Sequence, residues 1–393
     1  MYKISPGFPS VKNPDNLFIP EKNPLGTNYE ITSHFCHTET PETKIIQDFD
    51  QWAAQDLVGR LLSYSPGKHR VCRCCRSRRK GSEKIQVIKG KNKSYFGGVQ
   101  RCGSVWVCPV CARKITEFRR IELTGANSRW LASGGGLLML TLTVPHSFRD
   151  ELLYTLDGIS DAFEYLFRHR KFKTFLARLG YAGKVRVLED THGRNGWHPH
   201  FHILLYFERA FDFDCKGLSV SLLPEWKNAC AAVGLPEPNE HGLKIQDGCQ
   251  ASEYVSKWGI EHEMTKGHLK RARDNDSVSA FGLLDLVQQG HKNAPAWFRE
   301  HAFAMRGKHQ LSYSRGLREK LGMNIELTDQ EIADADDDIK RKIDSIRYED
   351  WKIILKKGAR SLVLKAHFDD DPAVFVGMIN AITSKNYTEG DFK

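Results

Sequence analysis

The sequence predicts an α+β protein in which helices flank a central antiparallel sheet. Residues 137–144, 184–189 and 197–207 are short apolar or alternating segments of the kind that form strands. Residues 148–179 carry apolar side chains at three- and four-residue steps, as an amphipathic helix does. The Gly- and Asn-rich segment 191–196 reads as a hairpin connection between two of the strands. Helices packed on paired strands of this kind form an α+β sandwich.

The remaining elements follow from the same patterns and from breaker residues. The C-terminal third is expected to be mostly helical, and Thr328-Asp-Gln-Glu331 matches a capping box that opens an acidic helix. The other expected elements are an extended lead-in over about thirty residues, helices at 41–63, 115–130 and 222–233, a short strand at 243–246, and helical character over 251–258.

A chain of 393 residues is too long for one hydrophobic core, so roughly two to four domains are expected. Changes in composition place the boundaries near three positions. The expected parts are an N-terminal lead-in and helix (1–65), a basic Cys-rich module (66–125), the domain that holds the sheet (126–270) and a mainly helical C-terminal region (271–393).

Positive charge is concentrated in one segment. Residues 68–120 hold sixteen Lys or Arg against two Glu, a local balance of +14 against +10 for the whole chain. A basic block beside an otherwise mildly acidic protein indicates contact with a polyanion, most often nucleic acid, although a solvated basic face is the alternative. The candidate DNA-binding residues are Arg73, Arg76, Arg78, Arg79 and Lys80.

Several classes of protein are disfavoured by what the sequence lacks. Residues 1–28 are polar and rich in Pro and Gly, unlike a secretory signal, and no stretch approaches the length of a membrane span. We therefore expect a cytoplasmic protein without a membrane partner, whose ten cysteines favour metal binding over disulfides. No Walker-type phosphate loop is present, so a nucleotide-driven motor is not supported.

Three histidines at alternating positions, His198, His200 and His202, lead into an apolar segment. Because successive side chains of a strand point to opposite faces, the three imidazoles would share one face. A core would have to supply each ring with a hydrogen-bond partner, whereas rings in line can bind a metal ion. The hairpin can bring Glu189 beside His200 and His202, and one carboxylate with two imidazoles binds a divalent ion with open positions. Mg²⁺ or Mn²⁺ is the ion that suits phosphoryl transfer. The alternative to a metal site is one buried histidine and two histidines on the surface.

Six cysteines cluster between positions 72 and 111, and four of them form two Cys-x-x-Cys pairs. The pairs are Cys72 with Cys75 and Cys108 with Cys111. Each such turn presents two thiolates to one tetrahedral ion, so the block looks like a structural zinc ribbon. Cys74 and Cys102 are alternative ligands, and the set of four stays open. Zinc would stabilise a loop-rich module that has little core of its own, whereas buried free thiols are the alternative.

Tyr254 is the best candidate nucleophile for chemistry at a phosphate. Tyr254 and Lys257 are three residues apart and would share one face of a helix. The ammonium could then stabilise the phenolate or the attacked phosphate. A core tyrosine beside a surface lysine is the alternative, because Tyr-x-x-Lys is common.

Three motifs in order resemble those of the rolling-circle plasmid replication initiators of the HUH endonuclease superfamily. The motifs are Leu140-Thr-Leu-Thr-Val144, then His198-Pro-His200-Phe-His202-Ile-Leu-Leu, then Glu253-Tyr254-Val-Ser-Lys257. The cysteine block that ends in Trp106-Val-Cys108-Pro-Val-Cys111 resembles a segment upstream of the first motif in many of these initiators. The resemblance covers roughly residues 70–320 and implies the HUH fold for the sheet domain, with the zinc-ribbon-like module and a helical C-terminal region attached.

The resemblance also implies a reaction. Such a protein nicks single-stranded or extruded origin DNA, becomes joined through a tyrosine to the 5′ phosphate, and releases a 3′ hydroxyl that primes synthesis by host polymerase and helicase. By position, Tyr254 matches the nucleophile and Lys257 the auxiliary lysine. His200 and His202 match the metal ligands, Glu189 is the third, and His198 lies beside them.

One position departs from the pattern of the family. Some members carry a glutamate one helical turn before the tyrosine, where it activates water at termination, and this chain has Gln250 there. Whether its cycle ends by hydrolysis or by a second strand transfer therefore stays open.

Three other functions compete with the initiator. A single-strand transposase of the same superfamily would share the metal site, but the position four after Tyr254, where some transposases have a second tyrosine, is Trp258. A zinc-stabilised, non-catalytic DNA-binding regulator would explain the cysteine block and leave the histidine strand unexplained. A metal-dependent nuclease that uses water would cut without becoming joined to DNA.

Overall fold

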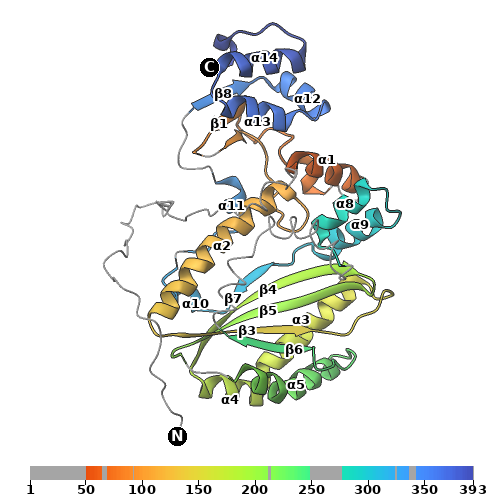
Figure 1. The fold of residues 1–393 in the computed structure, drawn as a ribbon, viewed down its shortest axis with the longest axis vertical. Helices are drawn as coiled ribbons and strands as arrows, with labels where there is room; N and C mark the ends of the chain where they lie inside the picture. Colours follow the sequence, from red (N-terminus) through yellow and green to blue (C-terminus); the bar gives the residue numbers. More distant parts are fainter. Residues whose placement is uncertain are drawn as a thin grey trace, which may run out of the picture. The chain divides into compact units, whose positions relative to one another are not determined.

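A computed structural model describes residues 50–63, 69–91, 93–210, 214–247, 277–323, 325–335 and 342–392. These residues all lie in the compact unit Gln47–Lys393. The unit is α+β, as predicted, and contains two antiparallel sheets (Figure 1). The expected N-terminal lead-in and the segment with Gln250, Tyr254 and Lys257 lie outside the described residues.

The larger sheet has five strands in the order β6-β3-β5-β4-β7, and every neighbouring pair is antiparallel. Its long central hairpin is built by β4 and β5, whose alternating apolar positions account for the strands. The five strands are β3 (Gly136–Thr143), β4 (Tyr181–Gly193), β5 (Gly196–Phe207), β6 (Leu243–Asp247) and β7 (Leu311–Tyr313). The two strands of the hairpin and its Gly-rich connection are confirmed.

One face of this sheet packs on α3 (Leu152–Arg168) and α5 (Cys215–Ala232). In Figure 1, α3 runs behind the strands, and α5 and α4 (Arg170–Arg178) lie below them. Phe201 and Ile203 of β5 are fully buried there, in a core that includes Phe163 of α3, Trp226 of α5 and many other apolar side chains. This burial fixes which side of β5 faces the helices.

The opposite face carries a second, smaller core under α2 (Pro109–Ala132) and α10 (Leu317–Lys320). Leu123 and Ala126 of α2 pack with Leu204 and Tyr206 of β5, all of them buried. The Tyr206 hydroxyl donates to the side-chain oxygen of Asn127 at 2.5 Å. The histidines of β5 come earlier on the same face as Leu204 and Tyr206.

Four expected helices differ in their bounds, each for a local reason. The helix expected over 41–63 begins at Gln51 as α1 (Gln51–Leu62), because Asp50 is extended and its side chain accepts from the backbone N–H of Trp52. The helix expected over 148–179 is two helices, α3 and α4, because His169 adopts an extended backbone (ψ 134°) that ends one and precedes the other. Helix α2 begins at Pro109, whose ring suits the first helical position. Helix α5 begins at Cys215, where the Asp214 side chain accepts a hydrogen bond from the backbone N–H of Gly217.

The smaller sheet joins the cysteine module to the C-terminal region. Its order is β2-β1-β8, with β1 (Ile85–Lys89) between β2 (Ser94–Gly97) and β8 (Lys342–Ile346). The helices around it are α1 (Gln51–Leu62), α12 (Tyr348–Lys356), α13 (Arg360–Phe368) and α14 (Pro372–Thr383).

The other described helices are η2 (Arg70–Arg73), in the cysteine module, and four in the C-terminal third. These four are α8 (Ala280–Gln288), α9 (Ala294–Ala304), α11 (Asp329–Asp334) and η4 (Glu389–Phe392). The capping box is confirmed, since Thr328 and Glu331 exchange side-chain and backbone hydrogen bonds at the start of α11. Among the helices that the structure describes, none combines the length and the apolar character needed to cross a membrane.

A buried ionic cluster ties α13 to α1. Arg360 is fully buried and donates to the side-chain oxygen of Gln55 at 2.5 Å, to the carbonyl oxygen of Trp52 at 3.1 Å and to the Asp56 carboxylate. The same carboxylate oxygen accepts from Arg76 at 2.5 Å. Two guanidinium groups therefore share one carboxylate where the C-terminal region meets α1 and the cysteine module.

Replacing Arg360 with Ala should lower the free energy of unfolding by about 3–5 kcal/mol, because it removes one partner of a buried ion pair and leaves a cavity. The matched control is Arg347→Ala. Arg347 lies on the surface and pairs with Asp391 at 3.5 Å, so its loss should cost less than about 1 kcal/mol. Urea unfolding followed by tryptophan fluorescence measures both values, and equal values would contradict the assigned role of Arg360.

Candidate functional site

The central hairpin brings a carboxylate and two imidazoles together on the open face of the sheet. Glu189 of β4 lies directly opposite His200 of β5, and His202 is two residues further along β5 on the same face. The Glu189 Oε2 atom lies 3.5 Å from His200 Nε2 and 3.7 Å from His202 Nε2. The ligand atoms of all three residues lie within 4.8 Å of one another. The structure thus brings together the three residues that the sequence selects as principal metal ligands.

These separations suit one divalent ion. With metal–ligand bonds of about 2.1 Å, neighbouring ligand atoms lie roughly 3.0–3.4 Å apart in octahedral or tetrahedral sites, so a small inward shift of the three side chains would complete the contacts. One carboxylate and two neutral imidazoles leave coordination positions for water and a substrate oxygen.

Both imidazoles are oriented through their other ring nitrogen. His200 Nδ1 lies 3.1 Å from the carbonyl oxygen of His198, and His202 Nδ1 lies 2.9 Å from the hydroxyl oxygen of Thr141 on β3. These contacts turn each Nε2 toward Glu189, and such outer partners fix the ring orientation of histidine ligands in metal sites. Thr141 is a site residue that the sequence analysis missed, although its place in the Leu-Thr-Leu-Thr strand could have suggested it.

The two imidazoles differ in their affinity for protons. Burial lowers the pKa of His202 to about 4, so its ring is neutral near pH 7 and able to bind a cation. Burial acts in the same direction on His200, but the hydrogen bond and negative charge of Glu189 outweigh it and raise the pKa of His200. A cation bound at Glu189 would replace that proton on His200.

His198 lies on the same face but outside the group of three. Its Nδ1 atom is 3.3 Å from Nδ1 of His146, and the two ring centroids are 4.7 Å apart. Burial and the neighbouring imidazoles of His200, His146 and His202 lower the pKa of His198 to about 4. His146 extends the row of rings to four, and the sequence analysis missed it because it follows Pro145 in a loop and belongs to no periodic pattern.

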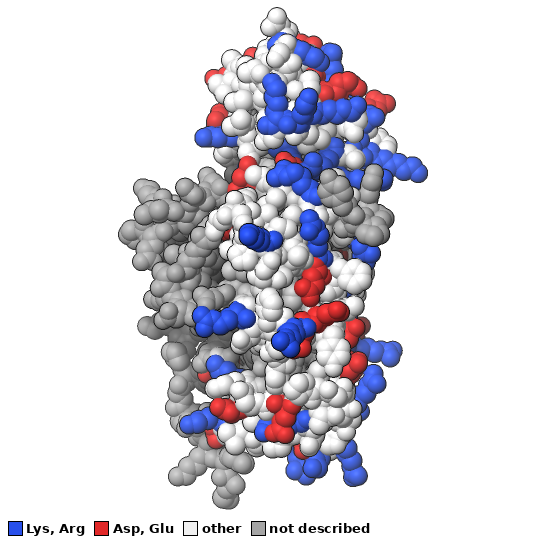
Figure 2. Space-filling model, turned by 90° about the vertical axis from the view of Figure 1, so that its right-hand side faces the viewer, with Lys and Arg blue, Asp and Glu red and all other residues white. Residues whose placement is uncertain are grey.

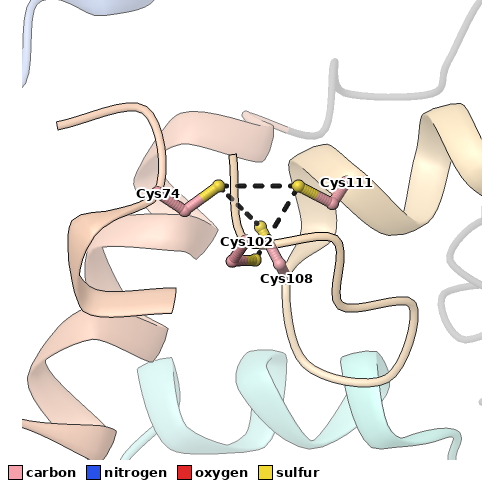
Figure 3. Close-up of side chains that lie close together, drawn as sticks. All are labelled: Cys74, Cys102, Cys108 and Cys111. Carbon is pink, nitrogen blue, oxygen red and sulfur yellow. Dashed lines mark hydrogen bonds between the residues drawn. The ribbon is translucent and has the colours of Figure 1, made fainter. Parts of the chain in front are cut away.

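A second cluster of potential ligands consists of Cys74, Cys102, Cys108 and Cys111, all of them buried. Figure 3 shows the four side chains pointing toward one another, Cys111 from the first turn of α2 and Cys108 from just before it. The Sγ–Sγ separations are 3.5 Å for Cys74–Cys111, 3.7 Å for Cys74–Cys108 and 3.8 Å for Cys102–Cys111. A tetrahedral ion with Zn–S bonds of about 2.3 Å has edges of about 3.8 Å, so the cluster fits zinc.

The structure therefore groups the two alternative cysteines with Cys108 and Cys111, in place of Cys72 and Cys75. The Cys72 thiol donates to the carbonyl oxygen of Gly59 at 3.7 Å. Cys75 has a left-handed backbone (φ 52°) and its sulfur accepts from Arg101 at 2.9 Å. The prediction of Cys72 and Cys75 as ligands, made from their Cys-x-x-Cys spacing, is wrong. Cys74 and Cys75 are adjacent, and only the backbone geometry decides which of the two faces the cluster.

The candidate DNA-binding residues of the basic segment differ in exposure. Arg76 is half-buried and paired with Asp56, whereas the other four, Arg73, Arg78, Arg79 and Lys80, are exposed. The guanidinium of Arg78 lies 4.5 Å from the ring centroid of Tyr348 and donates to the carbonyl oxygen of Glu83. On the face drawn in Figure 2, Lys and Arg side chains form a broad region in the upper part.

Comparison with known proteins shows what the part of the chain that holds this site resembles. Residues 98–217, which include the three cysteines from Cys102 to Cys111 and the Glu189, His200 and His202 group, match a family described as Replication protein. The resemblance to rolling-circle plasmid replication initiators that the motifs predict is therefore confirmed.

Individual relatives agree with this class. A protein named Protein rep from Streptomyces lividans is 25% identical over 336 residues, covering 66% of this chain and 73% of the relative. A Protein rep from Bacillus amyloliquefaciens is 33% identical over 113 residues, covering 27% of this chain and 31% of the relative. A Neomycin resistance protein from Streptomyces cyanogenus is 29% identical over 133 residues, covering 28% of this chain and 30% of the relative. No solved structure matches the chain significantly.

Replacing Thr141 with Val should weaken Mn²⁺ binding by about 10–100-fold, because it removes the hydroxyl that orients His202 and keeps the shape of the side chain. The control is Thr143→Val on the same strand, whose hydroxyl donates to the carbonyl oxygen of His241 at 3.4 Å. Calorimetric titration with Mn²⁺ measures both affinities. Unchanged binding in Thr141→Val would show that the hydroxyl does not orient a ligand.

Replacing Cys108 with Ser should abolish the binding of one zinc ion per chain and lower the melting temperature, because the cluster loses one of its four sulfur ligands. Replacing Cys72 with Ser should leave one zinc per chain, since its sulfur contacts Gly59 instead. Elemental analysis of the purified proteins and their melting temperatures distinguish the two variants. Loss of zinc in Cys72→Ser with retention in Cys108→Ser would reverse the assignment of ligands.

Proposed function

We propose that the protein initiates plasmid replication by nicking single-stranded or extruded origin DNA, with Tyr254 as the nucleophile. The sheet domain would then be an HUH endonuclease domain, and the released 3′ hydroxyl would prime synthesis by a host polymerase with a host helicase. The observation that carries the proposal is the group of Glu189, His200 and His202 on the two strands of the central hairpin. A divalent ion held there, Mg²⁺ or Mn²⁺, would supply positive charge to a phosphodiester oxygen.

The first contribution of the protein is to orient the imidazole rings of His200 and His202. Thr141 and the carbonyl oxygen of His198 fix the rings of His202 and His200, so the cation site is organised before the substrate arrives. Pre-organised charge of this kind stabilises the phosphate oxygens as negative charge develops on them. The site lies on β4 and β5. The edge strand β7 is next to β4, and β3 lies between β5 and the other edge strand, β6.

The chemical step we propose is one transesterification. The phenol oxygen of Tyr254 forms a bond to phosphorus as the bond from phosphorus to the 3′ oxygen breaks. The phenol proton leaves the nucleophile, and the departing 3′ oxygen takes up a proton to become a hydroxyl. Lys257 would stabilise the phenolate or the phosphate by its charge. The product is a 5′-phosphotyrosine and a free 3′ hydroxyl.

The length of the chain permits this assignment. Asp247, the last residue of β6, lies opposite Leu138 of β3, and Thr141 beside the metal ligands is three residues further along β3. That separation along the strand is about 10 Å. Tyr254 is seven residues beyond Asp247, and seven residues can span up to about 24 Å.

Covalent trapping tests the proposal. Full-length protein mixed with single-stranded DNA from its own plasmid's origin and Mn²⁺ should give a protein–DNA band on a denaturing gel. The band should disappear in Tyr254→Phe and with a chelator. The matched control is Tyr154→Phe, which removes the hydroxyl of an exposed tyrosine on α3 (62% exposed) and should leave the band unchanged.

The alternatives give different results in the same experiment. Cleavage without a covalent band would indicate a nuclease that uses water. Binding without cleavage by metal-loaded protein would indicate a DNA-binding regulator. A covalent band that persists in Tyr254→Phe would mean that another residue is the nucleophile.

A further inference from the structure

A cavity of about 850 Å³ lies between the cysteine module and the edge of the main sheet. Its walls come from the segment Gly103–Val107, from the connection between α9 and β7 (Ala302–Leu311), and from the turn before α11. Residues His69, Arg70 and Arg119 complete it. Neither the cysteine cluster nor the Glu189, His200 and His202 group lines this cavity.

Two cations of the cavity wall are available to an anion. Arg70 and Arg306 are both exposed, and within the described residues no ion pair joins either of them to a carboxylate. Both guanidinium groups lie near His69, whose pKa is lowered first by burial and then by the charges of Arg306 and Arg70. An anion between these groups would relieve the repulsion between like charges.

The other cations of the wall already have partners. Lys308 pairs with Asp157 at 2.6 Å. Arg119 is almost fully buried and lies within 3.6–3.8 Å of Glu122, Glu326 and Asp329. The charge offered to a ligand is therefore local to Arg70 and Arg306.

Trp106 lies in the same wall, and its ring is mostly packed in the core, with 9% of the residue exposed. Its indole N–H donates to the carbonyl oxygen of Lys308 at 2.8 Å, and its ring packs edge-on against buried His301. His69 accepts a hydrogen bond at Nδ1 from the backbone N–H of Val71, so its neutral ring carries the proton on Nε2 and can donate it. A fixed aromatic ring near guanidinium groups is the arrangement that binds an unpaired base and its phosphate.

The cavity is adjacent to the metal-ligand group through the edge of the sheet. The carbonyl oxygen of Gln310, in the cavity wall, accepts from the backbone N–H of Leu188 at 2.7 Å, and the next residue is Glu189. Leu311 pairs with Val187 in β4. Since paired strands are about 4.8 Å apart, a DNA strand at the metal site would pass close to the cavity.

We propose that this cavity binds an unpaired nucleotide of the DNA strand that reaches the metal site, with its phosphate at Arg70 and Arg306 and its base against Trp106. The choice of a DNA strand as the source rests on the proposed function. A free mononucleotide has the same chemistry, and the experiment below separates the two sources.

The first measurement is binding of fluorescent oligothymidylate (dT12) to full-length protein in a chelator, so that nicking plays no part. The double variant Arg70→Ala/Arg306→Ala should bind at least tenfold more weakly, with a salt dependence shallower by about 1–1.5 in slope. The control Arg209→Ala removes an exposed arginine just after β5 and should bind as the unchanged protein does. Unchanged binding by the double variant would overturn the proposal.

Two further measurements locate the ligand and identify its source. Photocrosslinking of bromodeoxyuridine-substituted dT12 to the unchanged protein should give a crosslinked peptide that contains Trp106, and crosslinks confined to other peptides would overturn the assignment. Thymidine monophosphate should compete only weakly with dT12. If the double variant loses affinity for thymidine monophosphate but binds dT12 unchanged, the cavity binds free nucleotides, and the proposal that it binds a DNA strand is wrong.

The outcome is independent of covalent trapping. Loss of dT12 binding in the double variant without any Tyr254-dependent covalent band would support the cavity and contradict the nicking function. A Tyr254-dependent covalent band, with dT12 binding unchanged in the double variant, would support the nicking function and contradict the role of the cavity.

Discussion

The antiparallel register between β4 and β5 is the constraint on which the sheet and the candidate metal site both depend. The register sets Glu189 opposite His200, and pleating then places His202 on the same face and Phe201 on the other. A slip of one residue would turn Phe201 toward solvent and drive the histidines into the core beside Phe163. The apolar packing under the sheet therefore positions the polar groups above it.

Helix α2 connects this sheet to the cysteine cluster. Its first turn carries Cys111, with Cys108 at the N-cap, and its later turns place Leu123 and Ala126 on the sheet. The N-terminal end of a helix carries partial positive charge, which favours thiolates there. An ion held by the four cysteines would thus fix the end of a helix whose other end covers part of the sheet, so the two candidate metal sites belong to one mechanical unit.

The sequence predicts the parts of this structure that depend on local periodicity. Alternation predicts the histidine strand and the Gly-rich connection predicts the hairpin, so the sequence alone groups Glu189, His200 and His202. Long-range pairing could not be predicted in this way. The small sheet needs β8, whose partner β1 lies more than 250 residues earlier, and no local pattern relates Ile346 to Ile85. The break between α3 and α4 at His169 is a matter of backbone conformation that apolar spacing does not record.

The choice of cysteines shows why spacing alone stops short of a ligand set. Cys74 and Cys75 are neighbours, and each is near enough to contribute a sulfur, since their Sγ atoms are 3.8 Å apart. Burial opposes a charge on Cys75, but the Cys74 thiol and the charge of Arg101 outweigh it and lower the pKa of Cys75 to about 7. Arg101 donates directly to that sulfur at 2.9 Å. Four thiolates around one zinc ion carry a net negative charge, and the half-buried guanidinium of Arg101 beside the cluster would offset part of it. The partner of the Cys75 sulfur is therefore Arg101, and Cys75 is not one of the four clustered cysteines. Arg101 lies twenty-six residues away in the chain, outside the Cys-x-x-Cys pattern.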